Sequence, residues 1–274
     1  MSIRVLVLRT AGINCDEEAV RAFQTALGET PGSTNSAVDL LHLNAVVSDP
    51  GRLEDTDILV VPGGFSYGDD VAAGRVYGVE LRRHLDAEIR AFVDRGGFVL
   101  GICNGFQVLV ELGLFEPDRA PHERTVALTD NASNTFEARW VTLRAEASAC
   151  DWLEAGWTLP CPVAHGEGRF VVDDPDALAR LEAAGQVVLR YVDPEAAPGE
   201  GAGYPANPNG SVGDIAGICD PTGRVVGLMP HPERNLTPWN HPLWTRMGDR
   251  AEGEGVRFFR QMVDAAAGRV PAVR

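Results

Sequence analysis

Apolar runs alternate with amphipathic stretches along the first hundred residues of the chain. Short and continuous apolar runs predict β-strands at 3–8, 38–43, 57–64 and 97–103. Between them, residues 16–27 and 78–97 place apolar side chains at helical spacing, and the second stretch ends at a Gly-Gly pair, which is common helix punctuation. This alternation predicts an α/β fold whose mostly parallel central sheet is covered by helices on both faces.

From about residue 120 the pattern changes to strands with longer connections. Apolar residues predict further strands within 136–144, 160–172, 186–192 and 223–235. Residues 255–267 read as a closing helix, whereas 193–214 is too rich in Gly, Pro and Asn for regular structure. Because no repeat or linker divides the chain, we expect one domain over residues 1–274, with extra β-strands in its second half.

Charge and composition narrow the possible functions. The chain has 274 residues and a net charge of −15, and all of its 24 basic residues are arginine. The absence of lysine excludes a Schiff-base lysine and the lysine of a Walker A phosphate loop. The acidic balance argues against binding to nucleic acid or anionic membranes. The first residues read as a strand rather than a signal peptide, and no apolar run has transmembrane length, so we expect a cytoplasmic protein.

The cysteines argue against two structural roles. There are five of them, an odd number, and no two form a Cys-x-x-Cys pair. A zinc site or a disulfide framework is therefore not expected, and a reducing compartment is. The sequence predicts no bound metal.

A cysteine stands at the predicted corner between the strand at 97–103 and the following helix. Gly101 and Gly105 flank Cys103 in a Gly-x-Cys-x-Gly turn, which resembles a nucleophile elbow. A helix N-terminus lowers a thiol pKa, and the N–H of Asn104 would point toward an oxyanion formed by attack of the sulfur. A small buried side chain filling the core is the alternative interpretation.

A cysteine nucleophile needs a base, and the base needs an orienting acceptor. His231 and Glu233 stand two residues apart after the last predicted strand, so their side chains project to the same side of an extended segment. Prolines on both sides of the histidine stiffen the backbone that presents it. An incidental surface turn is the alternative.

The glycine-rich loop after the strand at 57–64 is a third candidate. The N–H of Gly64 is placed to supply a second oxyanion donor, whereas phosphate binding is disfavoured because no GxGxxG motif or lysine is present. An ordinary tight turn also fits this loop. Cys15 is interpreted as structural or as lining the pocket.

Together, Gly-Gly-Phe at 63–65, GICNGFQ at 101–107 and HPE at 231–233 resemble class I, triad-type glutamine amidotransferases. Further stretches are similar to the glutaminase subunits and domains of phosphoribosylformylglycinamidine synthase. These are GINCDEE (12–18), GGFSYGDD (63–70), HGEGRF (165–170), YPANPNGS (204–211) and MPHPERN (229–235). The resemblance covers nearly the whole chain and implies a flavodoxin-like amidotransferase fold.

The resemblance implies a role for each matching residue. Cys103 would attack glutamine to form a γ-glutamyl thioester, with His231 as the base and Glu233 orienting it. The N–H groups of Gly64 and Asn104 would hold the oxyanion. The remaining implied substrate contacts are Gln107, Gly63 and Phe65, with His165 and Gly166 at the amino-acid end of the pocket.

The resemblance also implies partners. L-glutamine would be the substrate, and the ammonia would pass to a synthetase subunit that holds ATP and Mg and makes formylglycinamidine ribonucleotide in purine biosynthesis; a small auxiliary subunit is a further possible partner. No cofactor is expected in this chain.

The alternatives are an amidotransferase for CTP, GMP or anthranilate synthesis, and a non-catalytic regulatory subunit on the same fold. The YPANPNGS and HGEGRF stretches disfavour the first, and intact Cys103, His231 and Glu233 disfavour the second.

Overall fold

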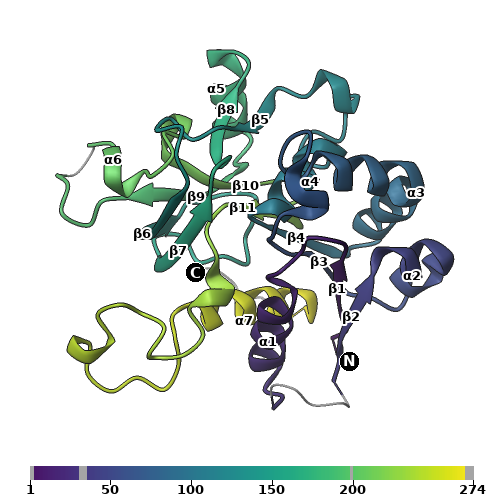
Figure 1. Ribbon diagram of the computed structural model, residues 1–274, viewed down its shortest axis with the longest axis horizontal. Helices are drawn as coiled ribbons and strands as arrows, with labels where there is room; N and C mark the ends of the chain where they lie inside the picture. The colour runs from purple at the N-terminus through teal and green to yellow at the C-terminus, as the bar shows by residue number, and fades with distance from the viewer. Residues whose placement is uncertain (1–2, 31–35, 198–199, 269–274) are drawn as a thin grey trace.

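The computed structural model of the chain describes residues 3–30, 36–197 and 200–268 (Figure 1). Nine strands form one sheet in the order β2-β1-β3-β4-β11-β10-β9-β6-β7, and β5 and β8 form a separate pair. The strands are β1 (Val5–Arg9), β2 (Val38–His42), β3 (Ile58–Val61), β4 (Phe98–Ile102), β5 (Val126–Thr129), β6 (Glu137–Ala145), β7 (Thr158–His165), β8 (Arg169–Val172), β9 (Val187–Val192), β10 (Ile215–Cys219) and β11 (Val225–Leu228).

Helices cover the parallel part of this sheet on both faces. Helices α3 and α4 pack together on one face, and α1 and α7 pack together on the other (Figure 1). The α-helices are α1 (Asp16–Leu27), α2 (Leu43–Ser48), α3 (Arg75–Asp94), α4 (Asn104–Leu112), α5 (Pro175–Ala183), α6 (Gly203–Ala206) and α7 (Gly255–Ala266). The 3₁₀ turns are η1 (Pro50–Leu53), η2 (Ser66–Asp69), η3 (Pro121–Glu123), η4 (Val212–Asp214), η5 (Pro232–Arg234) and η6 (Trp244–Arg246). No helix within the described ranges is both long and apolar enough to cross a membrane.

The predicted α/β architecture is confirmed, and so are the extra strands of the second half. Strands β2, β1, β3, β4 and β11 run parallel, and β10, β9, β6 and β7 extend the same sheet with antiparallel pairing. The parallel strands are the continuous apolar runs, as expected for strands buried on both faces.

Some boundaries differ from the sequence prediction. Helix α3 begins at Arg75 and ends at Asp94, because Gly96 takes a left-handed φ of 101° and stops it. The stretch 160–172, which was predicted to be strand, divides at the Gly-rich turn after His165, and β8 then pairs with β5. The loop 193–214 contains the short helix α6; its residues 198–199 lie outside the described residues.

Strand β11 determines where the site forms. It comes late in the chain but inserts in parallel beside β4, with Val225 opposite Val99 and Leu228 opposite Ile102. The backbone N–H of Cys103 donates to the Leu228 carbonyl at 2.8 Å. The residues that follow β11 therefore lie beside the residues that follow β4, at the carboxyl edge of the sheet where ligands bind in such folds.

Gly105 permits α4 to approach β3 closely, and we expect it to tolerate no side chain. A Cβ at this position would lie 1.8 Å from the Val61 carbonyl oxygen, which belongs to rigid backbone. Gly105→Ala should lower the free energy of unfolding by about 3 kcal/mol, at the upper end of overpacking costs. Urea denaturation measures this, with Gly51→Ala as the control because the nearest atom there, Asp49 Oδ1, is 3.4 Å away. A loss at Gly105 no larger than at Gly51 would contradict the packing argument.

Candidate active site

Cys103 occupies a strained corner between β4 and α4. It is the N-cap residue of α4, with φ 52° and ψ −108°, in the left-handed half of the map that a non-glycine residue rarely occupies. Strain of this kind persists where the surrounding structure enforces it, often at functional sites. The thiol is 6 % exposed and lines a cavity, so it is accessible to a small ligand.

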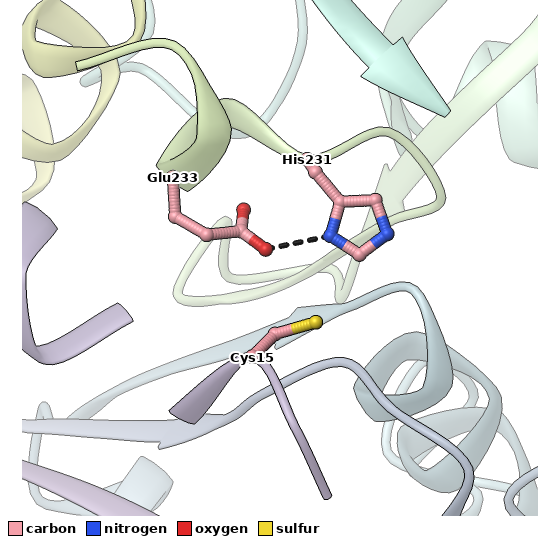
Figure 2. A group of neighbouring side chains, drawn as sticks. All are labelled: Cys15, His231 and Glu233. Carbon is pink, nitrogen blue, oxygen red and sulfur yellow. Dashed lines mark hydrogen bonds and ion pairs between the residues drawn. The ribbon is translucent and has the colours of Figure 1, made fainter. Parts of the chain in front are cut away.

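His231 and Glu233 form a buried pair close to this corner. The Nδ1 of His231 and the Oε1 of Glu233 are 2.6 Å apart, and η5 holds the two side chains facing each other (Figure 2). The His231 amide donates to the Pro162 carbonyl at 2.8 Å, which ties the histidine to β7. Burial alone lowers the pKa of His231, but the Glu233 carboxylate and the neighbouring thiols outweigh it and raise this pKa well above its ordinary value.

Gly63 lies between the imidazole and two thiols. A Cβ on Gly63 would be 2.9 Å from His231 Cε1, 3.2 Å from Cys15 Sγ and 3.4 Å from Cys103 Cβ. His231 interacts with both Cys103 and Cys15. The structure therefore brings together the three triad residues predicted from sequence, around a glycine that leaves room for them.

Two backbone N–H groups are free to bind an oxyanion. The amides of Gly64 and Asn104 donate to no acceptor within the described residues. Residues 12–15 brace the glycine loop, because the Phe65 amide donates to the Gly12 carbonyl at 2.9 Å and the Cys15 amide donates to the Gly63 carbonyl at 3.2 Å. Both predicted donors are thus presented by fixed backbone, as oxyanion stabilisation requires.

A cavity of about 170 Å³ opens beside Cys103. Its size suits an amino acid better than a nucleotide, because pockets for larger ligands run to roughly 300–1,000 Å³. Its lining residues are Gly64, Phe65, Asp69, Ala73, Cys103, Gln107, Phe136, Ala164, His165, Gly166 and Glu167. The predicted substrate contacts Phe65, Gln107, His165 and Gly166 are among them, whereas Gly63 is not.

The cavity contains two carboxylates that sequence reasoning missed. Asn104 Nδ2 donates to Asp69 Oδ1 and to Gln107 Oε1, each at 3.1 Å, and the Ala73 amide donates to Glu167 Oε2 at 3.1 Å. Burial raises the pKa of Asp69 above its ordinary value. Asp69 belongs to the GGFSYGDD motif and Glu167 to the HGEGRF motif. The acidic residues of these two motifs are therefore the sequence feature that could have predicted carboxylates in the cavity.

Cys15 is a second thiol near His231 but differs from Cys103 in its surroundings. It is 1 % exposed and does not line the cavity, and burial raises its pKa. Its S–H donates to Asn14 Oδ1 at 3.2 Å, and Arg234 Nη2 donates to the sulfur at 3.0 Å. A buried thiol that is held by hydrogen bonds suits a structural role behind the cavity better than the role of a nucleophile.

Cys15, His231 and Glu233 also carry potential metal-ligand atoms within 4.8 Å of one another (Figure 2). A cation there would have to replace the hydrogen bond between His231 and Glu233. It would also face the guanidinium of Arg234, whose positive charge repels it. The cluster is therefore better suited to hydrogen bonding than to metal binding.

Comparison with known proteins adds an independent observation. A sequence family described as the CobB/CobQ-like glutamine amidotransferase domain matches residues 2–264. The phosphoribosylformylglycinamidine synthase subunit PurQ of Methanococcus maripaludis is 41% identical over 253 residues, which is 92% of this chain and 89% of the relative. The same-named subunit of Dehalococcoides mccartyi is 40% identical over 262 residues, or 95% of this chain and 96% of the relative.

Solved structures agree with the sequence relatives. A chain in the structure of PurLQS from Thermotoga maritima is 31% identical and superposes with a TM-score of 0.67, covering 97% of this chain and 99% of that one. The glutaminase domain of Trypanosoma brucei CTPS, with bound acivicin, is only 15% identical, with a TM-score of 0.56 over 98% of this chain and 96% of that one. This second likeness concerns the fold alone.

Proposed function

This chain belongs to the CobB/CobQ-like glutamine amidotransferase family, and on that premise we propose that it is the glutaminase subunit of a phosphoribosylformylglycinamidine synthase. One observation carries the proposal: a cavity-lining thiol at a strained strand–helix corner stands beside a buried histidine–glutamate pair. The 41% identity to a PurQ subunit over 92% of the chain supports this particular synthase over other amidotransferases.

In the proposed reaction, Cys103 and His231 carry the bond changes. The sulfur attacks the side-chain carbonyl of glutamine while His231 takes the thiol proton, and Glu233 stabilises the imidazolium that forms. The Gly64 and Asn104 amides bind the oxyanion. His231 then returns the proton to the leaving ammonia, which yields a γ-glutamyl thioester that water hydrolyses to glutamate.

The cavity supplies a binding site for the amino-acid end of glutamine. Asp69 and Glu167 provide negative charge that matches the α-ammonium group, and charge-assisted hydrogen bonds of this type are the strong ones. Gln107 lines the same cavity and is fixed by its hydrogen bonds to Asn104 Nδ2 and to the Glu167 carbonyl. A neutral ligand of similar size would leave these carboxylates uncompensated.

The ammonia released in the proposed reaction is expected to pass to an acceptor site on another subunit. The names of its relatives describe synthase subunits, and the related Thermotoga chain comes from a structure named PurLQS. We therefore propose a synthetase subunit as partner, with ATP and Mg bound there and with a small auxiliary subunit as a further component. No lysine-based phosphate loop is present in this chain to hold the nucleotide.

Glutamate release tests both parts of this function. Purified chain should release glutamate from L-glutamine slowly by itself, and faster when mixed with its co-purified synthetase. Coupled glutamate dehydrogenase assays measure both rates. Absence of glutamate release in both preparations would refute the glutaminase assignment, whereas release that is unaffected by the synthetase would refute the partnership.

A further inference from the structure

His165 lies at the end of β7, and its tautomer is determined by one neighbour. Its Nδ1 is 3.1 Å from Asn131 Oδ1. The Asn131 amide nitrogen already donates to the carbonyls of Thr135 (2.9 Å) and His165 (2.8 Å), and its oxygen accepts from the Gly168 amide at 3.1 Å. Asn131 Oδ1 is therefore an acceptor, so Nδ1 of His165 must carry the proton and Nε2 must carry the lone pair.

The His165 ring cannot readily gain a second proton or rotate to exchange the positions of its two nitrogens. Burial, and then the charge of nearby His231, lower the pKa of His165 to about 3. One face of the imidazole lies against Gly168, where a Cβ would be 2.3 Å from Cε1 and Nδ1. His165 is thus a neutral imidazole at any ordinary pH, held in one tautomer and one orientation.

The lone pair on Nε2 has no use within the protein. Nε2 is buried, and no hydrogen-bond partner for it exists among the residues that the structure describes. His165 is 4 % exposed, yet it lines the same cavity as Cys103. It also lies close enough to His231 for the charge of His231 to lower its pKa. An unpaired buried acceptor is costly, which points to a ligand that supplies a donor.

The reacting amide has one group that needs such an acceptor. The free amides of Gly64 and Asn104 are donors and serve the carbonyl oxygen. His231 serves as donor when it returns its proton to the leaving nitrogen. The Ala164 carbonyl near the thiol already accepts from Cys103 Sγ at 3.9 Å. Nε2 of His165 is an acceptor in the same cavity that has no partner among the described residues, so it is available to an N–H bond of the carboxamide nitrogen.

We propose that Nε2 of His165 accepts a hydrogen bond from the leaving nitrogen of glutamine, first as carboxamide NH₂ and then as ammonia. This inference rests on the proposed glutaminase function and assigns His165 to the reacting end of the substrate, in place of the amino-acid end. In the step concerned, the carbon–sulfur bond forms, the carbon–nitrogen bond breaks, and the Cys103 proton reaches the nitrogen through His231. His165 accepts throughout and transfers no proton.

The test compares two leaving groups on the same acyl group. L-glutamine and the γ-methyl ester of L-glutamate give the same thioester, but the ester's leaving oxygen carries no N–H. His165→Asn keeps an N–H near the position of Nδ1 and removes the acceptor at Nε2. We expect kcat/KM to fall about 30-fold for glutamine and to stay within about threefold for the ester. His84→Ala, on the surface of α3, is the control and should affect neither substrate.

Other outcomes separate the possible failures. Equal losses for amide and ester in His165→Asn, or no loss for glutamine, would overturn the assignment of Nε2. Ester turnover also reports folding of the variant, so a misfolded protein cannot be taken for a lost hydrogen bond. If the unmodified protein releases glutamate from neither substrate, the proposed function itself fails.

Discussion

Replacement of Cys103 by alanine is expected to abolish glutamine hydrolysis, with a fall in kcat of about 10⁴-fold or more. The reason is geometric, because Cys103 alone among the cysteines combines the strained corner, the free oxyanion amides and access to the cavity. Measured glutamate release should fall to the limit of detection. The variant should keep its fold, since only one sulfur is removed.

Cys15→Ala is the matched control. This variant removes a second buried thiol that also interacts with His231 but does not line the cavity. We expect it to retain at least about a tenth of the original kcat, because Cys15 lies behind the reacting atoms. If Cys15→Ala abolished turnover and Cys103→Ala preserved it, the nucleophile would be Cys15.

Glu233→Gln should reduce kcat by about 10³- to 10⁴-fold with little change in KM. The carboxylate raises the pKa of His231 and accepts its Nδ1 proton, whereas an amide can turn its NH₂ toward Nδ1 and favour the wrong tautomer. The loss of this negative charge lowers the pKa of His231, so imidazolium beside Cys103 becomes less stable. Alkylation of Cys103 by iodoacetamide should then become fast only at higher pH than in the unmodified protein.

A surface carboxylate provides the comparison for this effect. Glu252 pairs with Arg260 at 2.9 Å, outside the site, and Glu252→Gln should change neither kcat nor the alkylation profile. The role assigned to Glu233 would be refuted if Glu233→Gln kept more than about a third of the original kcat. An unchanged alkylation profile would show that Glu233 orients the imidazole without charging it.

The proximity of Cys103, His231 and Glu233 was predictable because each of the two segments that carry them has a local signature. Gly101 and Gly105 mark the corner of Cys103, and the prolines around His231 mark a rigid presentation. The alternation of apolar runs and amphipathic stretches likewise predicted the parallel sheet. The position of β11 beside β4 could not be predicted from the sequence, because strand order depends on pairing between segments that are more than a hundred residues apart.

The hydrogen bonds that orient the other residues of the site could not be predicted from the sequence, for the same physical reason. The contact between Asn131 and His165 joins residues 34 apart, and Asn104 meets Asp69 across 35 residues. Such hydrogen bonds are made by single polar residues in loops. Because these residues form no repeating pattern, the sequence does not show which of them are paired. The division of residues 160–172 between β7 and β8 was missed because the apolar residues on both sides of the polar segment 165–169 do not show that the two strands pair with different partners.

The insertion of β11 between β4 and β10 also orders events during synthesis of the chain. Strands β1 to β4 and the corner of Cys103 are complete once α4 has left the ribosome, while β11 begins only at Val225. Until then the nascent chain carries the thiol without its base and leaves one edge of β4 unpaired. The strand that closes this edge is the one that delivers His231. The proposed reaction therefore requires the complete sheet.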